Sequence, residues 1–93
     1  MAIIWDSRKN KRLKATRQLS FDDVAQILLD KRYLAVLENP SHPDQMIFLV
    51  WYKNYTHVVP FVIDADDNIV LKTIFPSRKF HKLHGDKNDE NKT

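Results

Sequence analysis

Two runs of apolar and β-branched residues near the middle of the chain constrain its fold more than any other feature. The run from Met46 to Tyr52 and the run from Thr56 to Ile63 are separated by only three residues around Asn54. Runs of this length with a short polar connection are typical of a β-hairpin, so we expect a tight turn near Asn54. Pro60 has no backbone N–H to donate to a neighbouring strand, which predicts that its strand lies at an edge or carries a bulge.

The region before this hairpin has the patterns of two helices. Asp6 or Ser7 can cap a helix that reaches to about Gln18 and whose side chains are mostly cationic. Farther along, Ser20 followed three residues later by Asp23 resembles a capping box. The residues after this cap form one apolar stripe with helical spacing: Phe21, Val24, Ala25 and Leu28. We therefore expect a surface helix and then a helix that packs through its stripe.

Short strands and a final helix complete the expected fold. We expect strands at residues 3–5 and 33–37, a last strand from Ile69 to Phe75, and a short helix that Ser77 caps and that stops at Gly85. The predicted fold class is α+β. Two N-terminal helices pack on one face of a mainly antiparallel four- to five-stranded sheet, and a short C-terminal helix follows it.

The composition excludes several kinds of function. The chain has no cysteine, which removes disulfides, thiol nucleophiles and thiolate zinc sites and is compatible with a reducing cytoplasm. Its single glycine excludes the glycine-rich phosphate loops of ATP- and NAD-binding proteins. The longest apolar run has seven residues, whereas a membrane helix needs about twenty, so we expect a cytoplasmic protein. We expect one domain over residues 1–84 and a disordered tail over residues 85–93.

The net charge of +3 is unevenly distributed along the chain. Residues 1–17 carry a net charge of +5 and residues 71–84 carry +4, whereas residues 18–70 carry −5. If the fold brings the two basic segments together, they form a basic face suited to nucleic acid. The alternative is that each segment is solvated surface.

The second basic segment begins inside the last expected strand. Lys72 there interrupts an apolar face, either as a charge that protects an edge strand from aggregation or as the cationic floor of a groove. Arg78 follows the strand and can hold a phosphate through its planar fork of donors, or it belongs to a solvated turn. Alternation divides the strand into Ile69, Leu71, Thr73 and Phe75 on one face and Val70, Lys72 and Ile74 on the other.

The histidines are candidates for a different chemistry. His81 and His84 can share one face of the final helix, and His57 lies in the hairpin. A zinc site needs three or four ligands and no third ligand is evident, so we expect neither a metal nor a cofactor. Proton transfer near neutral pH suits histidine better. His42 lies in the segment "ENPSHPDQ" and is interpreted as a loop residue.

Four blocks of the sequence resemble BrnT-type toxins, which are related to the RelE and ParE toxins. The blocks are "IIWDSRKNKRLKATRQLSFDDVAQILLD", "ENPSHPDQ", "VVPFVID" and "LKTIFPSRK". They follow one another in the family's order, and the similarity covers nearly all of residues 3–82. The resemblance implies a RelE/BrnT-like fold. It also implies a small ribonuclease inhibited by a DNA-binding antitoxin that is encoded beside it.

The family's motifs fall on particular positions of this chain, and some positions depart from them. By resemblance, the Ser/Ala-Arg pair after the last strand falls on Ser77 and Arg78, its basic neighbour on Lys79, and the Trp-Asp pair on Trp5 and Asp6. Residues that differ from the family's pattern are Gln18, where glycine is usual, Met46, where arginine is usual, and Phe80 and His81, where a small residue and threonine are common.

Together with the basic segments, the resemblance implies a metal-independent endoribonuclease toxin that cleaves RNA through the RNA's own 2′-hydroxyl. Its expected partners are mRNA and a cognate antitoxin, through which alone it meets operator DNA; no membrane partner is expected. The predicted catalytic residues are Arg78 and Lys72, which stabilise the charged phosphate, and His81 or His57, which move protons. The predicted RNA-binding residues are Lys79, Lys82, Arg12 and Lys14. The alternatives are a non-catalytic nucleic-acid-binding or regulatory module of the same fold and a protein-interaction subunit.

Overall fold

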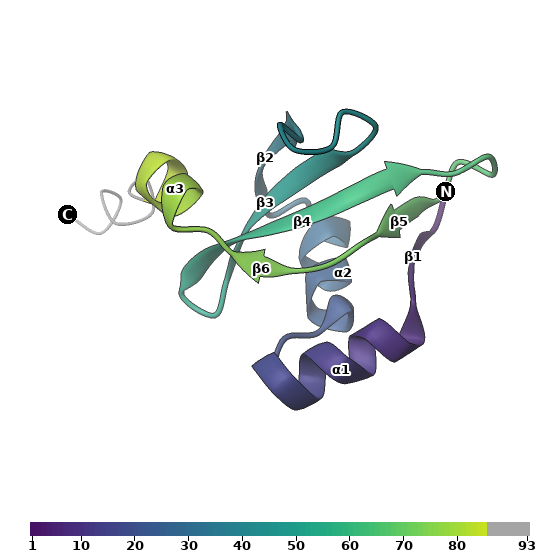
Figure 1. Cartoon of the computed structure of the whole chain (residues 1–93), viewed down its shortest axis with the longest axis horizontal. Helices are drawn as coiled ribbons and strands as arrows, with labels where there is room; N and C mark the ends of the chain where they lie inside the picture. The colour runs from purple at the N-terminus through teal and green to yellow at the C-terminus, as the bar shows by residue number, and fades with distance from the viewer. Residues whose placement is uncertain (86–93) are drawn as a thin grey trace.

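The chain folds around a six-stranded mixed sheet, in a computed structural model that describes residues 1–85 (Figure 1). The strand order is β1-β5-β4-β3-β2, and β6 also pairs with β4. The predicted α+β class is confirmed, whereas the part of the predicted tail beyond Gly85 lies outside the described residues. The elements are β1 (Ile3–Trp5), α1 (Ser7–Arg17), α2 (Phe21–Leu29), β2 (Tyr33–Glu38), β3 (Met46–Tyr52), β4 (Tyr55–Ile63), β5 (Ile69–Leu71), β6 (Phe75–Pro76), α3 (Arg78–Phe80) and a π-helix (His81–Gly85).

The predicted hairpin is confirmed as β3 and β4. Tyr52 pairs with Tyr55, so only Lys53 and Asn54 form the turn. Both turn residues have positive φ angles, 53° and 63°, which is the backbone geometry that matches a two-residue turn to the twist of its strands. Asparagine tolerates this conformation better than most residues, which explains the position of the turn.

Of the two alternatives predicted from Pro60, the edge strand is wrong, because β4 has partners on both sides, and the irregularity that was the other alternative lies in the segment opposite Pro60. On one side of β4 the neighbouring segment is interrupted, because it consists of two separate strands, β5 and β6. β5 ends opposite Phe61 and β6 begins opposite Val58, so residues 72–74 stand opposite only two residues of β4. The extra residue forms a break opposite Pro60, whose carbonyl oxygen accepts the N–H of Lys72 at 2.8 Å.

This break also overturns the predicted alternation of side chains from Ile69 to Phe75. Leu71 and Ile74 were expected on opposite faces, yet both are buried in the same core, 2 % and 1 % exposed. A single additional residue reverses the side-chain order that follows it. Consequently the expected last strand is two strands, and Lys72 and Thr73 are only partly buried between them.

The sheet has a large core on one face and a small one on the other. The two N-terminal helices lie together on one side of the sheet (Figure 1) and cover the large core, as predicted. Phe80 of α3 packs against the small core. Side chains in β3 alternate between the two cores, as they do in a strand that is buried on both faces. The large core contains Leu13, Leu19, Phe21, Val24, Ile27, Leu28, Phe48, Val50, Tyr52, Val59, Phe61, Leu71 and Ile74, and the small core contains Ile47, Leu49 and Val58.

Hydrogen bonds at the helix ends fix α1 and α2 against each other. Asp6 caps α1, and Gln18 ends it with a φ of 57°, the left-handed conformation that glycine usually supplies. Ser20 caps α2 by accepting the N–H of Asp23, which confirms the predicted cap. Asn10 was not predicted: it is buried, and its Oδ1 accepts the N–H of Phe21 at 2.9 Å. No helix in residues 1–85 is long and apolar enough to cross a membrane.

Candidate nucleic-acid interface

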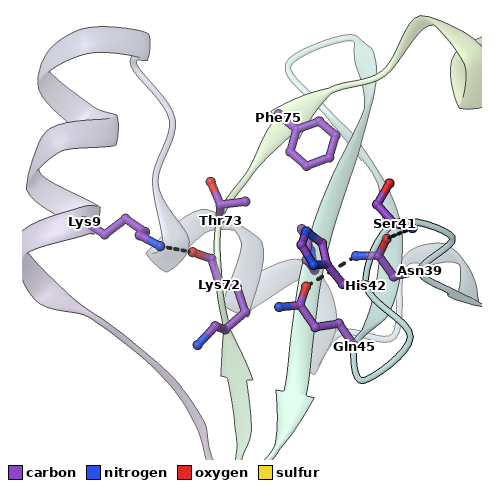
Figure 2. Close-up of a pocket in the computed structure, with 9 residues that line it drawn as sticks. Lys9, Asn39, Ser41, His42, Gln45, Lys72, Thr73 and Phe75 are labelled. Carbon is purple, nitrogen blue, oxygen red and sulfur yellow. Dashed lines mark hydrogen bonds between the residues drawn. The ribbon is translucent and has the colours of Figure 1, made fainter.

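The two basic segments of the sequence meet at the start of α1. β1 pairs with β5 in parallel, with Trp5 opposite Leu71, so the residues that follow the two strands leave the sheet on the same side. The ammonium group of Lys9 donates a hydrogen bond to the backbone oxygen of Lys72 at 2.7 Å (Figure 2). The first basic segment therefore lies beside residues 72–76 of the second one.

A groove runs along this junction and consists of two adjoining hollows. The first, the loop pocket, has a volume of about 390 Å³ and lies between the β2–β3 loop and the break between β5 and β6. Its lining residues are Lys9, Asn39, Ser41, His42, Gln45, Pro60, Lys72, Thr73 and Phe75. The second, the helix pocket, has a volume of about 340 Å³, and its lining residues are Lys9, Arg12, Leu13, Thr16, Arg17, Thr73, Ile74 and Phe75. Because the hollows share Lys9, Thr73 and Phe75, we treat them as one basic groove.

The electrostatics of the basic groove favour an anion. Its lining includes Lys9, Arg12, Arg17 and Lys72, and no carboxylate belongs to either set of lining residues that the structure describes. The ion pairs among residues 1–85 are Lys14 with Asp22 and Arg32 with Asp30, so they leave all four groove cations without a carboxylate partner. An anionic ligand that enters the groove thus does not have to displace an internal ion pair.

The ring of Phe75 adds an apolar surface to this cationic lining. Phe75 is 38 % exposed and borders both hollows. Within residues 1–85 its ring contacts no other aromatic ring, because its neighbour Ile74 fills the core in its place. Exposed aromatic rings beside cations are the surfaces on which unpaired nucleic-acid bases stack.

The predicted RNA-binding and phosphate-stabilising residues are divided among three places. Lys72 and Arg12 line the basic groove. Lys14 instead pairs with Asp22 at 3.0 Å; hydrogen bonds from Asn10 and then from Lys14 lower the pKa of Asp22 to about 2. The remaining three are exposed on α3 and the π-helix, well away from α1 in Figure 1: Arg78, Lys79 and Lys82.

The two histidines predicted to move protons lie on opposite faces of the sheet. His57 is 5 % exposed, faces the large core beside the ring of Tyr52, and bonds through Nδ1 with the backbone oxygen of Tyr55. Burial lowers the pKa of His57, since the charged ring loses its hydration. His81 faces the small core, and the structure places neither ring in the basic groove.

The contacts of the His81 ring indicate a structural role for this residue. Its ring stacks on Tyr55, with 4.0 Å between ring centroids, and lies nearly parallel to Trp51 at 5.7 Å. Its Nδ1 accepts the backbone N–H of buried Thr56 at 3.4 Å and lies 3.2 Å from the hydroxyl oxygen of Thr56. The histidine ring therefore gives a partner to a backbone donor at the point where β6 ends.

His42 lies in the β2–β3 loop, as interpreted from its sequence, and it also lines the loop pocket (Figure 2). No pattern within "ENPSHPDQ" distinguishes it from an ordinary loop histidine, because one wall of the pocket comes from distant parts of the chain: Lys9, Pro60, Lys72, Thr73 and Phe75. In the described residues no three histidine, aspartate or glutamate side chains gather as a metal site would require.

Comparisons with protein-family models, with curated proteins and with solved structures found no match. The groove combines four cations, a free aromatic ring and one histidine in a single surface.

Proposed function

We propose that this chain is the toxin of a toxin–antitoxin pair, a ribonuclease that holds single-stranded RNA in the basic groove and cleaves it without a metal ion. The observation that carries the proposal is the groove itself, with four cations and no carboxylate in its described lining. The resemblance of the sequence blocks to BrnT-like toxins supports the toxin assignment and a RelE/BrnT-like arrangement of the fold. It also supports mRNA as the substrate, a cytoplasmic location and a DNA-binding antitoxin as the partner.

The groove lining suits single-stranded RNA better than a double helix. Lys9, Arg12, Arg17 and Lys72 offer charge to successive phosphates, and binding of this kind releases counterions and weakens as salt rises. The ring of Phe75 lies between the two hollows and offers a stacking surface. In a double helix the stacked neighbours of each base cover both of its faces, so the ring favours an unpaired strand whose bases are unstacked.

Cleavage of RNA through its own 2′-hydroxyl requires few catalytic groups from a protein. The 2′-hydroxyl is the nucleophile, so the protein needs only to position the backbone, move a proton and stabilise the extra charge on the phosphate. Lys72 supplies positive charge within the groove. Arg78 lies outside it on α3, and its part in stabilising the transition state stays a prediction.

A non-catalytic RNA-binding module of the same fold is the second candidate. One observation favours it: His57 and His81, the residues predicted to move protons, lie outside the basic groove. His57 is buried, and His81 is held by stacking and by Thr56. Binding without cleavage is what this placement predicts if the chain contributes no other proton-transfer group.

Purified protein, incubated with end-labelled single-stranded RNA in the presence of EDTA, tests the proposal. Cleavage that the Arg12→Glu/Arg17→Glu variant loses, while its folding is unchanged by circular dichroism, supports the ribonuclease. Salt-sensitive binding without cleavage supports the second candidate. The absence of both would overturn the two nucleic-acid functions and favour a protein-interaction subunit.

A further inference from the structure

The β2–β3 loop is fixed by its own hydrogen bonds. The side-chain oxygen of Asn39 accepts the N–H of Ser41 at 3.0 Å, and its amide nitrogen donates to the side chain of Gln45 at 3.3 Å. The N–H of Gln45 donates to the backbone oxygen of His42 at 2.9 Å. His42 therefore lies in a closed loop whose backbone is hydrogen-bonded on both sides of it.

The opposite wall of the loop pocket is fixed as well. The N–H of Lys72 donates to the oxygen of Pro60 at 2.8 Å, and the oxygen of Lys72 accepts from Lys9 at 2.7 Å. Figure 2 shows His42, Lys72 and the ring of Phe75 around the same hollow, on the loop, at the break and on β6. A histidine, two lysines and an exposed aromatic residue thus line one pocket whose loop and opposite wall are both hydrogen-bonded: His42, Lys9, Lys72 and Phe75.

His42 is also singled out among the histidines. Of the three whose side chains the structure describes, it alone lines the basic groove, since His57 faces the large core and His81 stacks on Tyr55. Imidazole is the side chain best suited to take up and return a proton near neutral pH. The groove therefore contains the proton-transfer group that the second candidate function lacks.

We propose that the loop pocket is the reaction centre and that His42 is its proton-transfer residue, an inference that rests on the proposed ribonuclease function. Neutral His42 takes the proton of the 2′-hydroxyl, and the 2′-oxygen forms a bond to phosphorus. The positive charge of the two lysines that line the pocket, Lys9 and Lys72, stabilises the added charge. The bond from phosphorus to the 5′-oxygen then breaks, and the imidazolium returns the proton to that oxygen. The products are a 2′,3′-cyclic phosphate and a 5′-hydroxyl, and no other reactant is consumed.

The test measures single-turnover cleavage and RNA affinity of His42→Ala in the presence of EDTA. Removing a general acid–base group lowers the rate roughly 100-fold or more, whereas RNA affinity should stay within about twofold. The pH dependence of the residual rate should lose one ionisation. Asp44→Asn alters the same loop at an exposed position outside the groove lining, so it is the matched control and should cleave within about twofold of the unmodified protein.

The outcomes separate this inference from the proposed function. If the unmodified protein cleaves RNA to cyclic phosphates and His42→Ala cleaves equally fast, the assignment of His42 is overturned while the ribonuclease stands. If His42→Ala and Asp44→Asn both lose activity, loop geometry and not proton transfer explains the effect, and the assignment is likewise overturned. If the unmodified protein binds RNA without cleaving it, both proposals are overturned.

Discussion

Two regions of this molecule are basic, and they use their residues in different ways. In the basic groove, Lys72 and Phe75 border open hollows and have no internal charge or ring partner within residues 1–85. In the C-terminal cap, which we define as residues 77–83, the uncharged side chains hold the segment on the sheet. Phe80 packs on the small core, and His81 stacks on Tyr55. One continuous run of positive charge in the sequence thus divides into the lining of a groove and a segment that is docked on the sheet.

The largest effect expected from this comparison is on stability. Ile74 lies under the groove wall, is 1 % exposed and belongs to the large core, so Ile74→Ala should lower the free energy of unfolding by about 2–5 kcal/mol. Phe80→Ala is the matched change in the cap. Phe80 is only partly buried and packs on the small core, so its replacement should cost less. Urea unfolding of both variants measures the difference.

If Phe80→Ala lowered the free energy of unfolding as much as Ile74→Ala or more, the cap would be as strongly coupled to the fold as the groove wall. The two regions would then not differ in the way described. Hydrogen exchange gives a second reading. In Phe80→Ala the amide of Thr56, which donates to His81, should exchange faster while amides of the large core stay protected. Uniform loss of protection would contradict a locally docked cap.

The sequence predicted those elements that local rules determine. Ser20 caps a helix through its own neighbours, and the turn at Asn54 depends on two residues, so both were found. Pro60 indicated an edge or a bulge, but the division of the last strand opposite it was not found, because that division depends on the register between strands that are distant in sequence. His42 does lie in a loop, as interpreted, but for the same reason the sequence did not place it in a pocket. The role proposed for it depends on Lys72 and Phe75, about thirty positions away along the chain.

The second prediction separates the two regions by RNA binding. Arg12→Ala/Arg17→Ala removes two groove cations, and the slope of log affinity against log salt should become shallower by about 1.4, at about 0.7 for each phosphate contact of a single strand. Affinity itself should fall roughly tenfold near physiological salt. Fluorescence anisotropy with a labelled single-stranded RNA measures both values.

The matched control for the groove variant removes two cations from the cap, Arg78→Ala/Lys79→Ala. Both residues are exposed and neither lines the groove, so the salt dependence should change less than in the groove variant. A shift in slope that is as large in the cap variant would show that RNA follows the charge run across both regions. In that case the groove would not be the main binding surface.

The third prediction concerns the contact that joins the hairpin to the helix layer carrying the groove. The Tyr52 hydroxyl accepts the N–H of Ser20 at 3.1 Å and donates to Asp23 at 2.7 Å. Tyr52→Phe leaves the Ser20 N–H without this partner and should cost about 1 kcal/mol of unfolding free energy. Chemical denaturation of the variant and of the unmodified protein near neutral pH measures the cost.

The same tyrosine makes the stability of the protein depend on pH in the alkaline range. Burial and then the carboxylate of Asp23 raise the pKa of Tyr52 to about 12 from 10.0. The unfolded chain therefore loses this proton first, and the stability that depends on it is complete below pH 10 and is lost as the pH rises toward 12. Tyr52→Phe should lack this part of the loss. The tyrosinate absorbance of Tyr52 is the difference between the unmodified protein and Tyr52→Phe. A rise in this absorbance already near pH 10 would contradict the buried contact.

The smallest expected effect concerns the histidine on the side of the sheet opposite the cap. Burial lowers the pKa of His57 below 6.5, and the nearby charge of Lys53 acts in the same direction. The unfolded chain then binds the proton more readily than the folded one, so this stability is complete above pH 6.5 and is lost as the pH falls through the folded-state pKa. His57→Gln should make the protein less sensitive to acid, which unfolding curves between neutral and mildly acidic pH can detect.

His57 also provides a test of whether proton transfer takes place in the groove, because this histidine is buried and lies outside the groove lining. Its imidazole signals, followed by NMR, should titrate below pH 6.5, and His57→Gln should leave the single-turnover cleavage rate far less affected than His42→Ala does. A titration at or above 6.5, together with loss of cleavage in His57→Gln, would mean that the hairpin opens to admit substrate. Proton transfer would then belong to the large-core face, and the basic groove would only bind the RNA.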